Sequence, residues 1–139
     1  MIVENKEGSS CACLNNSSTF ILEDFIFACG DEVTNLNVSV SAGVFRIPFA
    51  MYLSSIRASV NTGPLGSGIV IDVKQNGSSL LSTLLTIDEN TETSVVAYVP
   101  HVIFDPILID DAKISVDIQQ VGSTFAGSGL KLVFKGYRI

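Results

Sequence analysis

The stretch Ile69–Ile87, IVIDVKQNGSSLLSTLLTI, determines the fold class that the sequence predicts. Ile69, Ile71 and Val73 alternate with Val70, Asp72 and Lys74, and this period of two is typical of a β-strand with one face on a core. Asn76-Gly77 follows directly, and both residues tolerate a positive φ angle, as a tight hairpin turn requires. The sequence therefore predicts a β-hairpin whose second strand spans residues 78–87.

The same alternation recurs on both sides of this hairpin. Residues 114–119 and 130–135 each place apolar side chains at every second position, and Ser54–Asn61 is a further candidate strand. The Gly-rich stretches Gly63–Gly68 and Gly122–Gly129 separate these strands as loops. Strands at this spacing predict an all-β protein, an antiparallel β-sandwich with a jelly-roll-like strand order.

The composition limits the function classes. A chain of 139 residues fits one domain, and 16% charged residues with a mean hydropathy of +0.45 exclude a disordered chain. Such apolarity suggests that copies of the chain, or a larger assembly, cover part of its surface. A net charge of −6 argues against binding to nucleic acid or to an anionic membrane, and no apolar stretch is long enough to span a bilayer.

The first 28 residues differ from the rest. Residues 1–18 are small and polar, and we interpret them as an N-terminal arm before a single β-sandwich domain over residues 19–139. The segment Phe20–Phe27 carries apolar residues on both faces of a possible strand, which indicates a covered edge strand or a partner-binding surface. We expect the partner contacts to come from Phe20, Ile21, Phe25, Ile26 and Phe27. Deletion of residues 1–28 is then expected to leave a folded domain that has lost its partner.

Three cysteines and one histidine offer little metal chemistry. Cys11, Cys13 and Cys29 are an odd number at one end of the chain, so they do not form a disulfide framework. A zinc site would need His101 from the distant half of the chain as the fourth ligand. We expect ordinary reduced cysteines, no metal and no cofactor.

No catalytic constellation stands out, so we do not expect an enzyme. His101 is the sole candidate general base, and no Gly-x-Ser-x-Gly elbow is present. The loop acids could bind calcium or act as paired carboxylates on a sugar, but no calcium-loop pattern and no tryptophan platform accompany them. These acids are Asp88, Glu89, Glu92, Asp105, Asp110 and Asp111. We interpret them as solvated loop residues.

Three segments resemble the virion structural proteins of tailed bacteriophages. Ile56–Gly77 contains the patterns A-x-V-x-T-x-P-x-G and D-V-x-x-N-G, and Ser79–Asp88 matches the strand that follows in those proteins. Asp111–Gly136, DAKISVDIQQVGSTFAGSGLKLVFKG, is similar to their C-terminal signature. The likeness covers roughly residues 45–138, and it leaves out the first 44 residues.

The resemblance implies a capsid decoration (cement) protein. Such a protein would be made in the bacterial cytoplasm, bind the major capsid protein on the outer head surface as a homotrimer, and stabilise capsomer contacts. The alternative is a tail-fibre, baseplate or head-fibre module that binds a host surface receptor. A third class, a small depolymerase, lacks an aromatic platform for its substrate.

Overall fold

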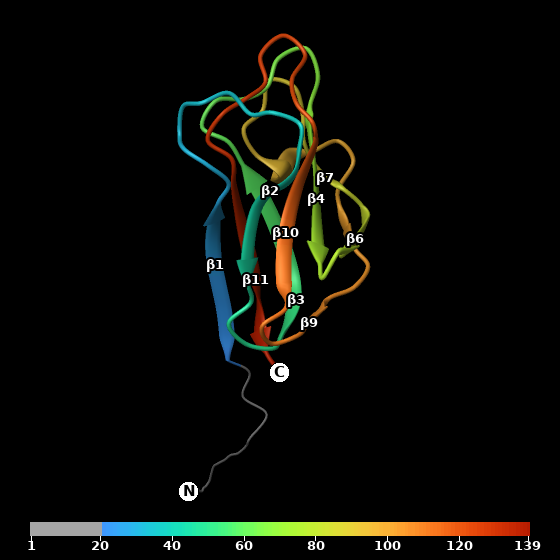
Figure 1. Ribbon diagram of the computed structural model, residues 1–139. Helices are drawn as coiled ribbons and strands as arrows, with labels where there is room; N and C mark the ends of the chain where they lie inside the picture. Colours follow the sequence, from blue (N-terminus) through green and yellow to red (C-terminus); the bar gives the residue numbers. More distant parts are fainter. Residues whose placement is uncertain (1–20) are drawn as a thin grey trace, which may run out of the picture.

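The computed structural model describes residues 21–139, which form an all-β structure (Figure 1). The longer strands are β1 (Leu22–Ala28), β2 (Ser39–Arg46), β3 (Met51–Ser59), β4 (Ile69–Gln75), β10 (Lys113–Gln120) and β11 (Lys131–Arg138). The shorter elements are β5 (Ser78–Ser79), β6 (Leu81–Thr83), β7 (Leu85–Ile87), the 3₁₀ turn η1 (Ser94–Val96), β8 (Val102–Ile103) and β9 (Ile107–Leu108). No helix in this part of the chain is long and apolar enough to cross a membrane.

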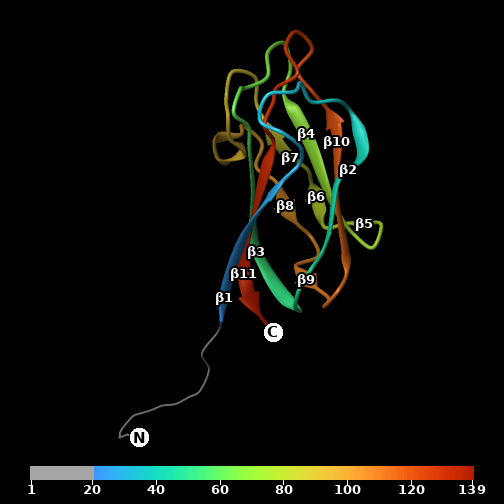
Figure 2. The ribbon, with the colours of Figure 1, turned by 60° about the vertical axis from the view of Figure 1, so that its left-hand side comes forward.

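Two antiparallel sheets pack face to face, which confirms the predicted β-sandwich. The first sheet has the order β1-β11-β3-β9, and the second has the order β2-β10-β4-β5, with β7 also paired to β4. Figure 2 shows the two layers, with β1, β3 and β11 on one side and β2, β4 and β10 on the other. A separate two-stranded ribbon joins β6 to β8. The buried faces of the sheets share one hydrophobic core.

The strand order is nested. The first strand, β1, pairs with the last strand, β11, and the second strand, β2, pairs with β10, the strand before the last. The chain changes sheet at each step from β1 to β4. Because of this nesting, the start of β1 and the C-terminus lie together at one end of the molecule, where the Arg138 N–H donates to the Ile21 carbonyl at 2.9 Å.

Four phenylalanines join the two sheets at one edge of the sandwich. Phe134 on β11 is fully buried, and its ring stacks on Phe25 of β1 at 5.1 Å between centroids. Phe45 of β2 meets Phe134 edge-on at 5.5 Å and Phe27 of β1 at 4.6 Å. Aromatic pairs at these separations contribute beyond their buried area, so β1 is fixed to the core by its side chains as well as by its hydrogen bonds.

The predicted hairpin is present, but the strand after it is not continuous. Asn76 and Gly77 have φ angles of 48° and 88°, the left-handed values of a type I′ turn, and Gln75 pairs with Ser78 across it. Residues 78–87 were expected to form one strand and instead form β5, β6 and β7. The Ser79 hydroxyl bonds to Asp72 and accepts from the Leu81 N–H, which turns the chain away from β4 toward β8.

Candidate functional site

The predicted contact residues lie on both faces of β1. Phe25 and Phe27 point inward and pack against the core, whereas Ile26 points outward and its side chain is 69% exposed. Ile21 comes directly before β1 and is exposed as well. Phe20 and the arm assigned to residues 1–18 lie outside the described residues. Within residues 21–139, β1 pairs with β11 alone, so it is an edge strand of the first sheet.

The place of β1 in the core corrects the expected effect of a long deletion. All seven residues of β1 pair with β11, and Phe25 and Phe27 complete the phenylalanine cluster. Removal of residues 1–28 would expose the rings of Phe45 and Phe134 and leave β11 as a bare edge. A truncation that tests the arm therefore has to end before Ile21.

A second apolar surface lies on the opposite edge of the sandwich, and the sequence analysis did not predict it. We call it the apolar rim. It consists of Val95, Val96, Tyr98, Val99, Val102, Phe104 and Ile107, all of them exposed. Ile109 is exposed too, but its turn lies beside the end of β2, where the Asp111 N–H donates to the Ile47 carbonyl. Tyr98 is 91% exposed and Phe104 is 75% exposed, which is unusual for such large side chains. A signal was available in the sequence, because residues 93–104 contain no Asp, Glu, Lys or Arg.

Backbone hydrogen bonds fix the apolar rim to the sandwich. The Ser94 hydroxyl accepts from the Ala58 N–H of β3 at 2.9 Å, and the Thr93 hydroxyl caps η1 by accepting from Val95 at 3.1 Å. The Tyr98 N–H donates to the Asp88 carboxylate at 2.7 Å. The Phe104 N–H donates to the Leu80 carbonyl at 2.8 Å. With its main chain held in this way, the rim presents its apolar side chains outward from an anchored loop.

The edge formed by β1 and β2 also carries exposed apolar side chains. We call it the β1–β2 edge and define it by two groups of exposed residues, Ile21, Leu22 and Ile26 at β1 and Val38, Val40 and Val44 at β2. The outward side chains of β1 and β2 face away from each other, because the two strands belong to different sheets and their inward phenylalanines meet between them. Val40 is 81% exposed. β1 and β9 are the two edge strands of the first sheet, and β2 and β5 end the main path of the second, so this edge and the rim lie on opposite sides of the molecule (Figure 1).

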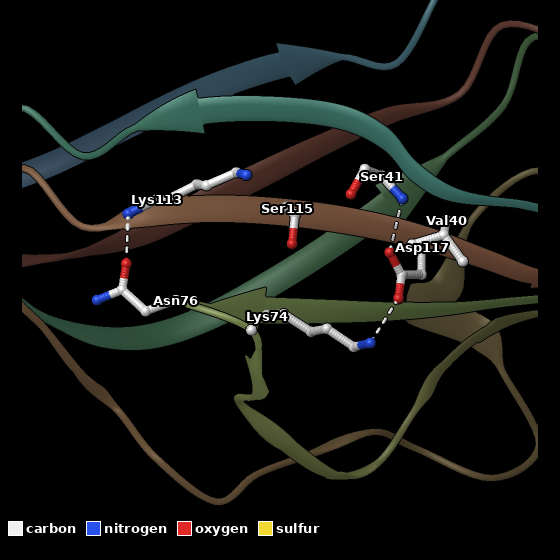
Figure 3. A pocket seen from close by; sticks show the side chains of 8 residues that line it. Val40, Ser41, Lys74, Asn76, Lys113, Ser115 and Asp117 are labelled. Carbon is white, nitrogen blue, oxygen red and sulfur yellow. Dashed lines mark hydrogen bonds and ion pairs between the residues drawn. The ribbon is translucent and has the colours of Figure 1, made fainter.

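A polar pocket of about 490 Å³ lies on the outward face of the second sheet (Figure 3). It is lined by Val40, Ser41, Lys74, Asn76, Gly77, Lys113, Ser115 and Asp117. The Asp117 side chain is buried and forms an ion pair with Lys74 at 2.8 Å. Its other oxygen accepts from the Ser41 N–H at 2.8 Å.

Asp117 is placed by a bulge in β2. Val116 pairs with Gly43 and Ile118 pairs with Ser39, so residues 40–42 stand opposite Asp117 alone. Ser41 has a φ angle of 55° within this bulge, and the Asp117 carboxylate takes the place of a ladder carbonyl for its N–H group. Bulges of this kind redirect side chains at a sheet edge, and here the exposed Val40 is the side chain next to the bend.

The carboxylate of Asp117 is stabilised in its charged form. Burial alone would raise the pKa of Asp117, but the hydrogen bonds from Lys74 and from the Ser41 N–H, with the positive charge of Lys74, lower it below the usual 3.8. The pKa of Lys74 is raised mainly by its hydrogen bond to Asp117. A compensated carboxylate of this kind can bind polar groups, but it is a poor general base.

The described part of the chain brings no metal-binding group together. Among residues 21–139 no three His, Cys, Asp or Glu side chains are placed to hold an ion. Cys29 is buried, and burial raises the pKa of its thiol to about 11, while Cys11 and Cys13 lie outside the described residues. His101 is partly buried, which lowers its pKa.

Two of the six loop acids accept hydrogen bonds from backbone N–H groups of other loops. Asp88 accepts from the Tyr98 N–H, and Glu89 accepts from the Gly66 N–H at 2.9 Å. Each of them therefore connects one loop to another, which accounts for both residues without a bound ion.

No family model matches the sequence, and neither a curated protein nor a solved structure matches the chain.

Proposed function

We propose that this chain is a structural protein of a tailed-phage virion and that it decorates the outside of the head. The observation that carries the proposal is the pair of exposed apolar surfaces, the rim and the β1–β2 edge, on opposite sides of one small sandwich. Clusters of large exposed apolar side chains are typical of assembly contacts. They suit a protein that is held between neighbours in a repeated lattice.

The place of the resembling segments supports this role. The phage-like stretches Ile56–Gly77 and Asp111–Gly136 contain β4, β10 and most of β11, the central strands of the two sheets. The apolar residues of the β1–β2 edge lie within the first 44 residues, which lack that likeness, whereas the rim lies between the quoted segments, inside residues 45–138. Virion structural proteins that dock on different surfaces would need the same central strands with different exposed segments around them.

The nested strand order also supports the proposal. We interpret the orders β1-β11-β3-β9 and β2-β10-β4-β5 as a jelly roll, because first and last strands pair in both sheets. Jelly rolls are frequent in viral capsid proteins. This support is an analogy of fold, so the apolar surfaces remain the main argument.

The electrostatics fit an external position. A net charge of −6 would repel packaged DNA, and it would favour the outer face of a head over the inner one. We propose that the protein sits there as a homotrimer and contacts the major capsid protein through apolar side chains. Each contact would be small, and the stabilisation of the head would come from their number.

Binding to purified heads tests the proposal. The protein is mixed with expanded, undecorated heads and sedimented, and the bound copies are counted against concentration. We expect saturation at a fixed number of copies per head and a higher melting temperature of the head. Phe104→Asp is expected to weaken binding, whereas the matched apolar change Phe104→Leu keeps it. Heads that bind neither the wild-type protein nor Phe104→Leu contradict the proposal.

The polar pocket favours one alternative, a module that binds a host surface receptor. The ammonium group, carboxylate and hydroxyls of Lys74, Asp117 and Ser115 are groups that can bind sugar hydroxyls. In that case the purified protein would bind host cells or their surface polysaccharide. Lys74→Ala would then abolish cell binding, and binding to heads would be absent.

A further inference from the structure

We infer that the polar pocket on the outward face of the second sheet binds a carboxylate group carried by a hydroxylated molecule, as in an acidic sugar. This inference goes beyond the proposed decoration role and does not depend on it, because it rests on the pocket alone. The pocket combines a buried hydroxyl without a partner, a single unpaired positive charge and a carboxylate that is already neutralised.

The base of the pocket holds the buried hydroxyl. Ser115 is 7% exposed and lines the pocket from β10, where it lies between Val44 of β2 and Lys74 of β4. Its hydroxyl makes no hydrogen bond within residues 21–139. Polar side chains buried to this extent are normally hydrogen-bonded, so the Ser115 hydroxyl is available to a polar ligand that enters the pocket.

One end of the pocket carries the unpaired positive charge. Lys113 lies two positions before Ser115 on β10 and is exposed, and its ammonium group pairs with no acid in the part of the chain that the structure describes (Figure 3). Its cross-strand neighbour Arg46 already has Asp111 at 3.9 Å. Lys113 is therefore the cation that remains for a ligand, and an anion beside it would form a charge-assisted hydrogen bond.

The other end of the pocket is electrically balanced. Both oxygens of Asp117 are occupied, one by Lys74 and the other by the Ser41 N–H, each at 2.8 Å. Two lysines and one aspartate line the pocket, which leaves a formal charge of +1. A singly charged carboxylate matches this charge, whereas a doubly charged phosphate would keep one charge uncompensated beside Asp117.

The remaining lining suits hydroxyl groups. The Ser41 hydroxyl makes no hydrogen bond to any described residue, and the Asn76 amide uses its oxygen to accept from the Lys113 N–H at 3.0 Å, so its NH₂ group remains a donor. The volume of about 490 Å³ falls within the range of roughly 300–1,000 Å³ found for small-molecule sites. A ligand that fills this mostly polar space needs hydroxyls as well as a carboxylate.

Titration of the full chain with sodium glucuronate tests the inference. Amide signals of the isotopically labelled protein are followed by NMR at constant ionic strength, and their shifts give the dissociation constant. We expect saturable shifts confined to the second sheet, at Ser41, Lys74, Lys113 and Ser115. A titration without saturable shifts at these residues would overturn the inference.

Three further probes distinguish the parts of the ligand. Glucose has the hydroxyls without the carboxylate, acetate has the carboxylate without the hydroxyls, and inorganic phosphate carries two charges at mildly alkaline pH. We expect each of them to bind at least about tenfold more weakly than glucuronate. Glucose or acetate binding as tightly as glucuronate would show that one part of the ligand is not recognised, and tight binding of phosphate would show that the pocket does not select a single charge. Each of these results would overturn the inference.

Two variants remove the groups that the ligand would use. Neither the Lys113 nor the Ser115 side chain makes a hydrogen bond or ion pair within residues 21–139, so Lys113→Gln and Ser115→Ala should keep the fold, which the NMR spectrum verifies. We expect Lys113→Gln to raise the Kd for glucuronate more than about fivefold and Ser115→Ala more than about twofold.

Lys135→Gln is the matched control, since it removes an equal charge from β11 in the other sheet. The control should leave the Kd for glucuronate unchanged. An equal weakening by Lys135→Gln and Lys113→Gln would indicate general attraction by charge, and an unchanged Kd in both pocket variants would indicate binding elsewhere. Either result would overturn the inference.

The inference and the proposed function can fail separately. A protein that coats undecorated heads but gives no saturable shifts with glucuronate would overturn the ligand site and leave the decoration role intact. A protein that binds glucuronate in the pocket but no heads would do the reverse.

Discussion

At the residue scale, Asp117 connects the bulge of β2 to β4. It is buried, and its oxygens bind Lys74 and the Ser41 N–H. Asp117→Asn removes the charge from both bonds, so we expect a loss of about 1–3 kcal/mol of unfolding free energy at neutral pH. Chemical denaturation of the two proteins measures the difference.

The difference should depend on pH. The pKa of Asp117 is lower in the folded protein than its usual 3.8, so its contribution is complete above that value and disappears as the pH falls through the folded pKa. Wild type and Asp117→Asn should therefore converge in stability at acidic pH. A difference that stays constant from about pH 7 to about pH 3 would show that Asp117 acts by its shape alone.

Phe134 tests the central aromatic cluster. Its ring is fully buried against Phe25 and Phe45, so Phe134→Ala should lower the unfolding free energy by about 3–5 kcal/mol. Phe104→Ala on the exposed rim is the matched control, with an expected change within about 0.5 kcal/mol. Equal losses for the two variants would mean that the Phe104 ring is buried, for example against a second copy.

Cys29 should be chemically inert in the folded protein. Burial raises the pKa of its thiol to about 11, so almost none of it is thiolate near neutral pH. Pulse alkylation followed by peptide mass spectrometry should label Cys29 only after denaturant is added. Rapid labelling of native Cys29 would contradict its burial.

At the element scale, β1 separates two roles that the sequence pattern merged. The apolar residues of segment 20–27 predicted a strand, and β1 is present there. Because both faces of the segment are apolar, its sequence does not tell which face packs on the core and which is exposed. That distinction depends on β2 and β11, which bring Phe45 and Phe134 from distant parts of the chain. The sequence pattern therefore predicted all five residues as partner contacts. In the fold, Phe25 and Phe27 belong to the core, whereas Ile21 and Ile26 are exposed.

Two truncations check this division. Deletion of residues 1–20 leaves β1 whole, and we expect its unfolding transition to stay close to that of the full chain. Deletion of residues 1–28 removes Phe25, Phe27 and every backbone pair between β1 and β11. The unfolding transition of this truncation should therefore shift to a much lower denaturant concentration. Similar transitions for both truncations would mean that β1 contributes little to the core.

The regular strands were predictable and the rim was not, for a physical reason. Residues 69–75 and 114–119 alternate because each has a buried and an outward face, and the Asn76-Gly77 turn requires its two residue types. The rim is an irregular loop whose position depends on single hydrogen bonds to Asp88, Leu80 and β3. No short-range pattern encodes such contacts, although the lack of charge in residues 93–104 does mark the segment.

At the scale of the whole molecule, the exposed edges explain the high hydropathy of the chain. A sandwich of this size can bury its core and still retain apolar residues, and here most of the large apolar residues that remain exposed belong to the rim or to the β1–β2 edge. A protein that worked alone would gain nothing from such edges and would risk aggregation through them. Their presence is consistent with a protein whose working state is an assembly.

The central claim is that this chain is part of a phage particle. Quantitative mass spectrometry of virions, purified by density gradient from the phage that encodes the chain, tests it most directly. The account predicts the chain in intact virions at many copies per head, in a constant ratio to the major capsid protein, with gradual loss when heads are stripped by mild denaturant. Its absence from purified virions, in a lysate where the free chain is abundant, would contradict the account.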